Sequence, residues 1–260
     1  MTALLDLVLE SHGTLERWRK FNAIDVNLSM HGSHWTRKGW DGVFENVQLK
    51  AQTKEQRTCF THFTEEGVQS IYEPDRVRLE TINGKLIEER VHPRNAFEGH
   101  TLQTTWDRLH LAYFTGYALW NYLNTPFMFV TESAKAEEID PATDQGTVRR
   151  RLKITFPEKV GTHCPDQIFH VDENGLIARL DYTTLCPRRY RYLCNCFDLK
   201  KHSDGRKHAS KWVPPDCPMA RAVGVIGDWG RHNRLEERVH PRKTFEGHAR
   251  VRSWRGHKRT

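Results

Sequence analysis

Apolar and polar residues alternate along several short segments of this chain. The alternation is clearest in residues 24–30, where every second position is apolar: Ile24, Val26, Leu28 and Met30. It returns in residues 47–51, 77–80 and 148–156. A period of two is typical of a strand with one buried and one exposed face. The pattern therefore predicts several half-buried strands.

Two of the expected strand pairs are joined by an Asn-Gly dipeptide, at Asn83-Gly84 and Asn174-Gly175. This dipeptide favours two-residue hairpin turns of the primed type, in which both central residues have positive φ. Short strands joined by tight turns predict an antiparallel meander. The acidic, proline-containing stretch 133–146 is expected to be a surface loop.

Helical periods precede and interrupt the strands. Residues 2–11 and 15–21 predict two N-terminal helices, the first ended by Gly13 and the second capped by Thr14. Residues 103–123 are too long for a strand and are apolar nearly all round, so we expect a helix buried on several sides. A concave sheet can enclose such a helix. The pattern predicts an α+β fold, with a curved, mostly antiparallel sheet over an aromatic helix.

Charge and cysteine content change sharply after residue 185. Residues 186–260 contain 19 Lys and Arg against 7 Asp and Glu, whereas residues 1–185 have a balance of −5. Four of the six cysteines lie in this last part, and no strand or helix period is sustained there. We therefore expect two regions, a β domain at 1–185 and a basic, poorly ordered or aberrant tail at 186–260.

A short internal copy supports this boundary. Residues 88–100 (EERVHPRNAFEGH) recur at 236–248 (EERVHPRKTFEGH), identical at eleven of thirteen positions. Thirteen residues are fewer than one structural repeat, so a solenoid is excluded. The tail can be a native fold, a fusion or the product of a frame change, and a duplicated or displaced coding segment accounts for the copy.

Two segments resemble a known family. Residues 8–30 (VLESHGTLERWRKFNAIDVNLSM) are similar to the helix-then-strand start of outer-membrane lipoprotein carriers of the LolA/LolB type. Residues 97–127 (FEGHTLQTTWDRLHLAYFTGYALWNYLNTPF) are similar to soluble relatives of that group. The resemblance covers about residues 3–184. It implies an open half-barrel with a helical lid over an apolar cavity that accepts lipid acyl chains.

The expected cavity lies between the sheet and the aromatic helix. Its predicted ligand-binding side chains are those on residues 106–120: Trp106, Leu109, Tyr113, Phe114, Tyr117 and Trp120. Binding of a lipid or another hydrophobic ligand is the leading hypothesis. The alternative is that these aromatic side chains simply fill the core.

An enzyme of the same fold is the second hypothesis. Histidines and acids gather in residues 92–110, and the candidate catalytic residues are His92, His100, Asp107 and His110. Asp107 and His110 are three residues apart, so on a helix they share one face, where a carboxylate can orient an imidazole. The alternative is an acid at a helix N-terminus beside a histidine at the edge of the lid. We expect a binding protein rather than an enzyme, and no cofactor.

The tail offers weak candidates for two other functions. Its cysteines are possible zinc ligands, although the usual C-x2-C spacing is missing: Cys186, Cys194, Cys196 and Cys217. Its basic residues with interleaved tryptophans can hold phosphates and stack on bases, so nucleic-acid binding through 186–260 is a third hypothesis.

The N-terminus and the apolar content bear on location. Residues 1–13 have no basic start and carry Asp6 and Glu10, so they predict a helix and not a secretion signal. The chain has no stretch of about 18 uncharged apolar residues, so no membrane span is predicted. We therefore expect a cytoplasmic protein with reduced cysteines and without stable membrane insertion.

Overall fold

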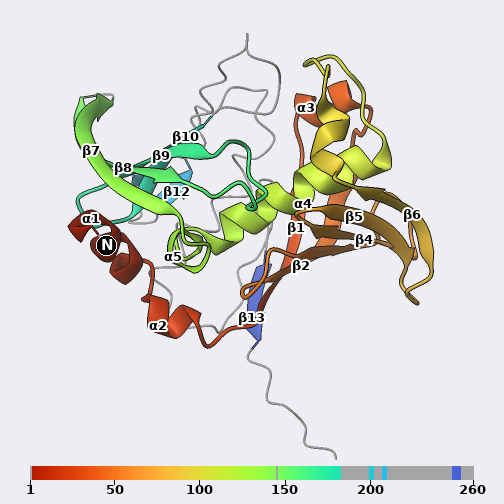
Figure 1. Ribbon diagram of the computed structural model, residues 1–260, viewed down its shortest axis with the longest axis horizontal. Helices are drawn as coiled ribbons and strands as arrows, with labels where there is room; N and C mark the ends of the chain where they lie inside the picture. Colours follow the sequence, from red (N-terminus) through yellow and green to blue (C-terminus); the bar gives the residue numbers. More distant parts are fainter. Residues whose placement is uncertain (1, 145, 183–198, 202–206, 210–247, 253–260) are drawn as a thin grey trace, which may run out of the picture.

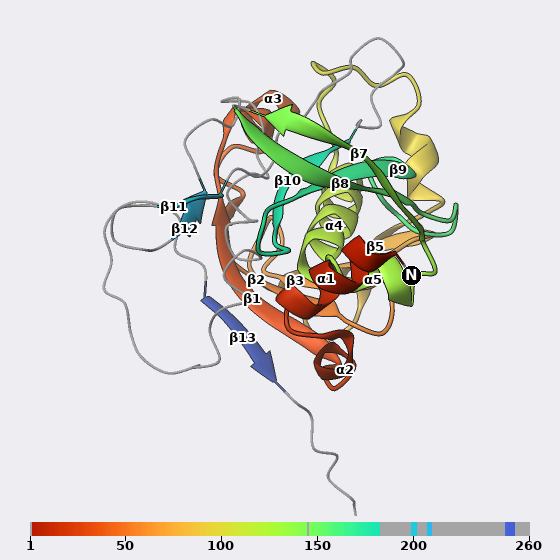
Figure 2. The ribbon, with the colours of Figure 1, turned by 90° about the vertical axis from the view of Figure 1, so that its left-hand side faces the viewer.

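The structure, a computed structural model, describes residues 2–144, 146–182, 199–201, 207–209 and 248–252. The described strands form a seven-stranded and a four-stranded sheet with a short ribbon, and every pairing is antiparallel. In both ribbon views helix α4 lies between the two sheets (Figures 1 and 2). The predicted α+β class is confirmed, with the strands divided between two open sheets instead of one.

The seven-stranded sheet is a meander for most of its width, in the order β13-β1-β2-β3-β4-β5-β6. Six of its strands are consecutive in the chain, each paired with the next: β1 (Ala23–Met30), β2 (Phe44–Gln52), β3 (Thr58–Thr61), β4 (Val68–Glu73), β5 (Arg76–Thr81) and β6 (Leu86–Val91). β13 (His248–Arg252) pairs with β1. The predicted alternation at 24–30 gives β1 its burial pattern, with Ile24, Val26, Leu28 and Met30 buried.

The four-stranded sheet covers the other side of α4, in the order β10-β9-β8-β7. Its strands are β7 (Lys135–Asp144), β8 (Thr147–Thr155), β9 (Asp166–Val171) and β10 (Ile177–Asp181). The ribbon consists of β11 (Leu199–Lys201) and β12 (Lys207–Ala209). The predicted domain boundary at 185/186 lies outside the described residues.

Five α-helices and one 3-10 helix are described: α1 (Ala3–Ser11), α2 (Leu15–Trp18), α3 (Ser33–Lys38), η1 (Pro93–Phe97), α4 (Arg108–Asn124) and α5 (Met128–Thr131). The sequence predicts α1 closely, and the Thr14 hydroxyl caps α2 as expected. α2 ends at Trp18, three residues earlier than predicted.

The two Asn-Gly turns differ from the predicted type. Positive φ occurs at Gly84 and Gly175 alone, and not at Asn83 or Asn174. The Asp172 carboxylate accepts hydrogen bonds from the amides of Asn174 and Leu176. These bonds hold the turn at Asn174-Gly175 as a loop of more than two residues. The hairpins are therefore three-to-five-residue loops with one left-handed glycine, so the prediction of primed two-residue turns is wrong.

The stretch 133–146 is a strand for most of its length, which corrects the predicted surface loop. β7 is the edge strand of its sheet and pairs with β8. Its proline does not interrupt the pairing because Pro141 lies in a bulge between Ile139 and Ala142. Proline and acidic residues are tolerated at an edge, where one side of the backbone has no partner strand.

α4 begins at Arg108 instead of residue 103, because the Asp107 side chain accepts a hydrogen bond from the His110 amide and ends the preceding loop. The prediction of burial on several sides is confirmed, since residues from Leu111 to Asn124 are all buried. Gly116 allows a close approach to the sheet: a Cβ there would lie 2.4 Å from the Tyr72 Cβ. α4 therefore lies almost against the backbone of β4.

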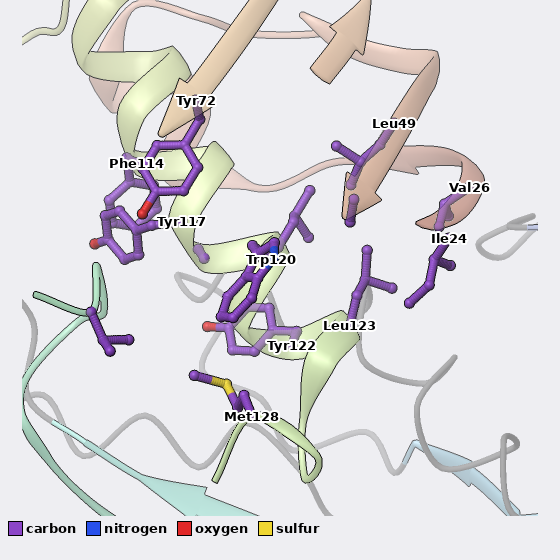
Figure 3. Close-up of a cluster of buried hydrophobic side chains, with 14 of the residues drawn as sticks. Ile24, Val26, Leu49, Tyr72, Phe114, Tyr117, Trp120, Tyr122, Leu123 and Met128 are labelled. Carbon is purple, nitrogen blue, oxygen red and sulfur yellow. The ribbon is translucent and has the colours of Figure 1, made fainter. Parts of the chain in front are cut away.

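The two sheets and α4 share one hydrophobic core. Figure 3 shows Tyr72, Phe114 and Tyr117 together at one part of α4, with Trp120 and Leu123 further along it. The Gln56 side chain joins the sheets directly, donating to the Gly161 carbonyl at 2.6 Å and accepting from the Gly161 amide at 2.8 Å.

Candidate functional site

Helix α3 covers the N-terminal part of α4 and has a glycine at each end. Gly32 precedes it with no side-chain cap, and Gly39 ends it in the left-handed conformation, at φ 85°. Glycine adopts this conformation at no steric cost, which explains why so short a helix ends there. Two flexible positions therefore flank a six-residue helix.

The side chain of Trp35 projects from α3 into the core, where it is 1% exposed. Its ring centroid lies 4.8 Å from that of Phe44 and 6.4 Å from that of Phe114 on α4. Trp35 is therefore the apolar anchor of α3.

An aromatic cluster fills the space between α3 and α4, formed by His34, Trp35, Trp106 and Phe114. The His34 ring lies 5.2 Å from Trp35 and 5.3 Å from Trp106. Trp106 in turn lies 4.8 Å from Phe114. Among the described residues, the indole N–H groups of Trp35 and Trp106 are buried and have no hydrogen-bond partner.

A buried lysine holds α3 to the loop before α4. Lys38 is 1% exposed, and its ammonium donates to the carbonyls of Thr101, Leu102 and Thr104 at 3.1, 3.0 and 2.9 Å. It also lies 4.8 Å from the centre of the Trp106 ring. Three carbonyl acceptors and an aromatic face therefore take the place of water around the Lys38 ammonium.

The six predicted ligand-binding side chains are all buried, at 9% exposure or less: Trp106, Leu109, Tyr113, Phe114, Tyr117 and Trp120. All six belong to the shared hydrophobic core, and ring contacts link Phe114 to Tyr117 and Tyr117 to Tyr113. Trp106 and Phe114 belong to the aromatic cluster under α3, whereas Trp120 donates from its indole N–H to the carbonyls of Gln52 and Glu55. Their role in ligand binding stays a prediction.

Three of the four predicted catalytic residues lie together. The His100 and His110 ring centroids are 4.7 Å apart. His110 Nδ1 lies 2.8 Å from Asp107 Oδ1 without forming a hydrogen bond, and that oxygen accepts from the His110 amide. His92 is exposed at the start of η1, and among the described residues it makes no ring or hydrogen-bond contact with the other three.

The charges around this group favour a structural role for Asp107. Arg90 binds it through two hydrogen bonds, of 2.6 and 3.2 Å. Burial raises the pKa of Asp107, but the bonds from Arg90 and the His110 amide outweigh it and lower that pKa from 3.8 to about 2. Partial burial, the His110 ring and Lys38 lower the pKa of His100, which favours its neutral form. An acid that stays ionised is a cap and ion-pair partner, and not a proton donor.

Sequence reasoning missed the contribution of α3. Its residues in the stretch HGSHWTRKGW had no place in the predicted strands. Two signals were available, the glycines at both ends and two tryptophans within six residues. A lysine with three carbonyl partners leaves no such signal, because its partners are backbone atoms.

A second buried polar group was also missed. His163 is 3% exposed and lies between two phenols, with Tyr117 Oη 3.1 Å from Nδ1 and Tyr122 Oη 2.9 Å from Nε2. Tyr182 stacks on the His163 ring at 4.3 Å and bonds to Tyr122 at 3.0 Å. This network holds the loop between β8 and β9 against α4.

The predicted zinc ligands and most of the basic tail lie outside the described residues. Cys186, Cys194, Cys196 and Cys217 lie outside the described residues, as do the tail's tryptophans. Within the described ranges, no three His, Cys, Asp or Glu side chains are grouped to hold a metal ion. In the same ranges no helix has the length and apolar character needed to cross a membrane.

Comparisons with known proteins give similarities in structure alone. No family model and no curated protein matches the chain. A DUF1329 family protein from Desulfovibrio piger is similar over 80% of this chain and 82% of its own, with 10% identity and a TM-score of 0.40. The putative outer membrane lipoprotein-sorting protein domain from Vibrio parahaemolyticus covers 79% and 81%, with 11% identity and a TM-score of 0.37.

A LolA superfamily protein from Nitrosomonas europaea is similar over 68% of this chain and 70% of its own, with 8% identity and a TM-score of 0.34. Two of these three descriptions name the group that residues 3–184 resemble. The TM-scores and identities are low, so the function proposed next depends on this chain's own residues.

Proposed function

We propose that this protein binds a hydrophobic ligand of the lipid class between α3 and α4. The observation that carries the proposal is the packing of α3: a six-residue helix between two glycines, with one large aromatic side chain inserted into an aromatic cluster. Such a helix is suited to act as a lid. Trp35 occupies the position that the apolar part of a ligand takes when α3 moves outward.

The walls of this site differ in how firmly they are held. α4 is buried along its length and lies against β4 at Gly116, so it forms a fixed floor. α3 packs through Trp35 and is tied by Lys38 to the loop at 101–104. The helix and the loop therefore move together, and the ammonium keeps its three carbonyl partners during the motion.

Burial of an acyl chain provides the free energy for opening. Each methylene transferred from water contributes about 0.8 kcal/mol. A chain of ten or more methylenes thus gains several kcal/mol, which offsets the loss of the Trp35 contacts. Small polar molecules gain no such free energy and are excluded.

Photo-crosslinking tests the site directly. The purified full-length chain is exposed to a long-chain alcohol with a diazirine near its end and illuminated, and the labelled residues are mapped by mass spectrometry. We expect labels in residues 33–38 and 106–117, lost when unlabelled alcohol is added in excess.

Labels confined to other parts of the chain, or none at all, would contradict the proposal. Lipid extraction of the freshly purified protein provides a second measurement. Mass spectrometry of the extract should detect the bound natural ligand, and the mass of that ligand gives its chain length. The cytoplasmic location stays part of this proposal and is checked by cell fractionation.

A further inference from the structure

We propose that two copies of this protein pair along strand β6, so that their seven-stranded sheets join into one continuous antiparallel sheet. This assembly is independent of the proposed ligand site, to which no residue of β6 belongs. Three features of β6 support it: exposed apolar side chains, backbone groups that point away from the sheet, and a sequence that complements itself.

β6 ends the seven-stranded sheet and has no partner on its outer side within the described part of the chain. Figure 1 shows it at the end of that sheet, away from the four-stranded sheet. Four of the six large apolar side chains that are exposed among the described residues lie on β6 or just before it: Ile82, Leu86, Ile87 and Val91. An open edge with apolar side chains is a template for a further strand.

The other sheet ends in an edge of a different kind. β7 has four acidic residues and a bulge that contains Pro141, and both features discourage pairing with another strand. β6 has no proline, and its charged residues form ion pairs within their own chain: Glu88 with Arg108 at 3.4 Å, Glu89 with Arg76 at 3.3 Å and Arg90 with Asp107 at 2.6 Å. Charges that are neutralised in this way repel an incoming strand less than unpaired charges do.

The backbone of β6 has groups directed outward at alternate residues. The His92 amide donates to the Asp75 carbonyl at 2.8 Å, so His92 directs its amide toward β5. Because successive residues of an antiparallel strand direct their backbone groups to opposite sides, those of Glu89 and Val91 point away from β5. Ile87 has no partner in the register with β5, because it lies at a bulge. Its backbone is therefore also available to another strand.

A two-fold axis through Glu89 pairs these residues with each other. Glu89 then lies opposite Glu89 of the second copy, and Ile87 lies opposite Val91. The three residue pairs of this register form about six hydrogen bonds. An axis through Val91 instead places Glu89 opposite Pro93, which has no amide to donate. The backbone therefore favours the axis through Glu89.

The same axis also brings complementary charges together. Glu88 of each copy lies opposite Arg90 of the other, and opposite charges at such positions stabilise a strand pair. The two Glu89 side chains face each other, and the Arg76 guanidinium beside each of them offsets their repulsion. A two-fold interface uses the same patch on both copies, so that patch must complement itself. The sequence of residues 87–91, IEERV, meets this condition about its centre, which identifies a second copy as the partner of β6.

Sedimentation velocity of the full-length chain, from about 1 to about 200 µM, tests the assembly. We expect the parent chain to change from monomer to dimer over this range. V91K places a lysine on the open edge, so it should weaken dimerisation about tenfold or more. The matched control is V148K, because Val148 is also an exposed valine, on β8 of the other sheet, and this variant should dimerise like the parent chain.

Hydrogen exchange at the two ends of this concentration range tests the register. The amides of Glu89 and Val91 should gain protection with concentration in the parent chain and not in V91K. The amide of Arg90, which points toward β5, should stay protected at both concentrations in both proteins, which also shows that V91K keeps its fold.

Three results would overturn the proposal. The first is a parent chain that stays monomeric over the whole range. The second is a dimer that V91K leaves unchanged, or that V91K and V148K weaken equally. The third is protection of Glu89 and Val91 at every concentration, which would mean that another strand of the same chain covers the edge.

Discussion

Asp107 shows how one side chain serves both a helix and an ion pair. Its Oδ1 atom caps α4, while both carboxylate oxygens accept from Arg90 on β6. The sequence identified this residue as a candidate catalytic carboxylate that orients an imidazole. The alternative considered with it, an acid at a helix N-terminus, is the role that these contacts describe.

The first prediction concerns the charge of Asp107 and is tested by the substitution D107N. Asparagine keeps the capping oxygen but loses the ion pair with Arg90. The pKa of Asp107 is lowered in the folded protein, so its charge stabilises the fold above pH 4, and this stabilisation is lost as the pH falls to about 2. The side chain is 45% exposed, so solvent limits the effect to about 1 kcal/mol at pH 7.

Urea unfolding of D107N and the parent chain, at pH 7 and near pH 2, measures this difference. The two proteins should differ at pH 7 and converge at low pH. A difference that is the same at both pH values would show that the Asp107 charge does not contribute.

At the scale of elements, the close approach of α4 to β4 depends on the absence of a side chain at Gly116. The Tyr72 Cβ and Cγ atoms lie 2.4 and 2.6 Å from the place where a Cβ would be. A side chain there forces the helix away from the sheet or moves a fully buried tyrosine.

The second prediction concerns the free energy of unfolding of G116A. The direction of its change separates the effect of helix propensity from the effect of a steric clash. Alanine is about 1 kcal/mol better than glycine inside a helix, so helix propensity alone predicts stabilisation. The clash with Tyr72 predicts a net loss of about 1–3 kcal/mol instead. Thermal or urea unfolding decides between them, and a more stable G116A would mean that α4 is not held this closely.

The sequence predicts some elements better than others for physical reasons. β1 carries a strong period because it is half-buried. α4 is recognised because its segment is too long for a strand and apolar nearly all round. Both are found, although α4 begins five residues later than predicted. β7 was missed because an edge strand needs neither an apolar period nor the absence of proline. α3 was missed because six residues hold too few turns to show a period. The turn types depended on an aspartate, Asp172, outside the Asn-Gly dipeptide.

In the candidate site, too, the sequence predicts some residues and misses others. The aromatic residues of α4 stand out in the sequence because of their number. Lys38 does not, since it binds carbonyl groups in a loop more than sixty residues away. Contacts with backbone atoms at long range leave no trace in the order of residues.

At the scale of the whole molecule, the two sheets are joined through α4 and through Gln56. The helix contributes side chains to one continuous core, and the Gln56 amide bonds to both backbone groups of Gly161 across the sheets. Among the described residues, neither sheet has a core of its own.

The third prediction follows from this shared core, and the substitution is F169A. Phe169 on β9 is 2% exposed and lies 4.6 Å from Phe129. Its removal should cost about 3–5 kcal/mol. Because the sheets unfold together, the slowest amides of β4 in the distant sheet should lose as much protection as those of β9.

Native-state hydrogen exchange of the parent chain and F169A measures both losses. Protection that falls in β9 and stays unchanged in β4 would mean that the sheets unfold independently.

The order of the strands has a consequence for synthesis of the chain. β1 to β6 pair in the order in which they leave the ribosome, so this part of the seven-stranded sheet needs few long-range contacts and can form early. The apolar face of that sheet is then open until α4, which ends at Asn124, has also emerged. During that interval the nascent protein exposes a sheet without its helix, the state in which chaperones bind and aggregation begins. The helix that forms the floor of the proposed ligand site therefore also ends this exposure, because it covers the apolar face of the sheet.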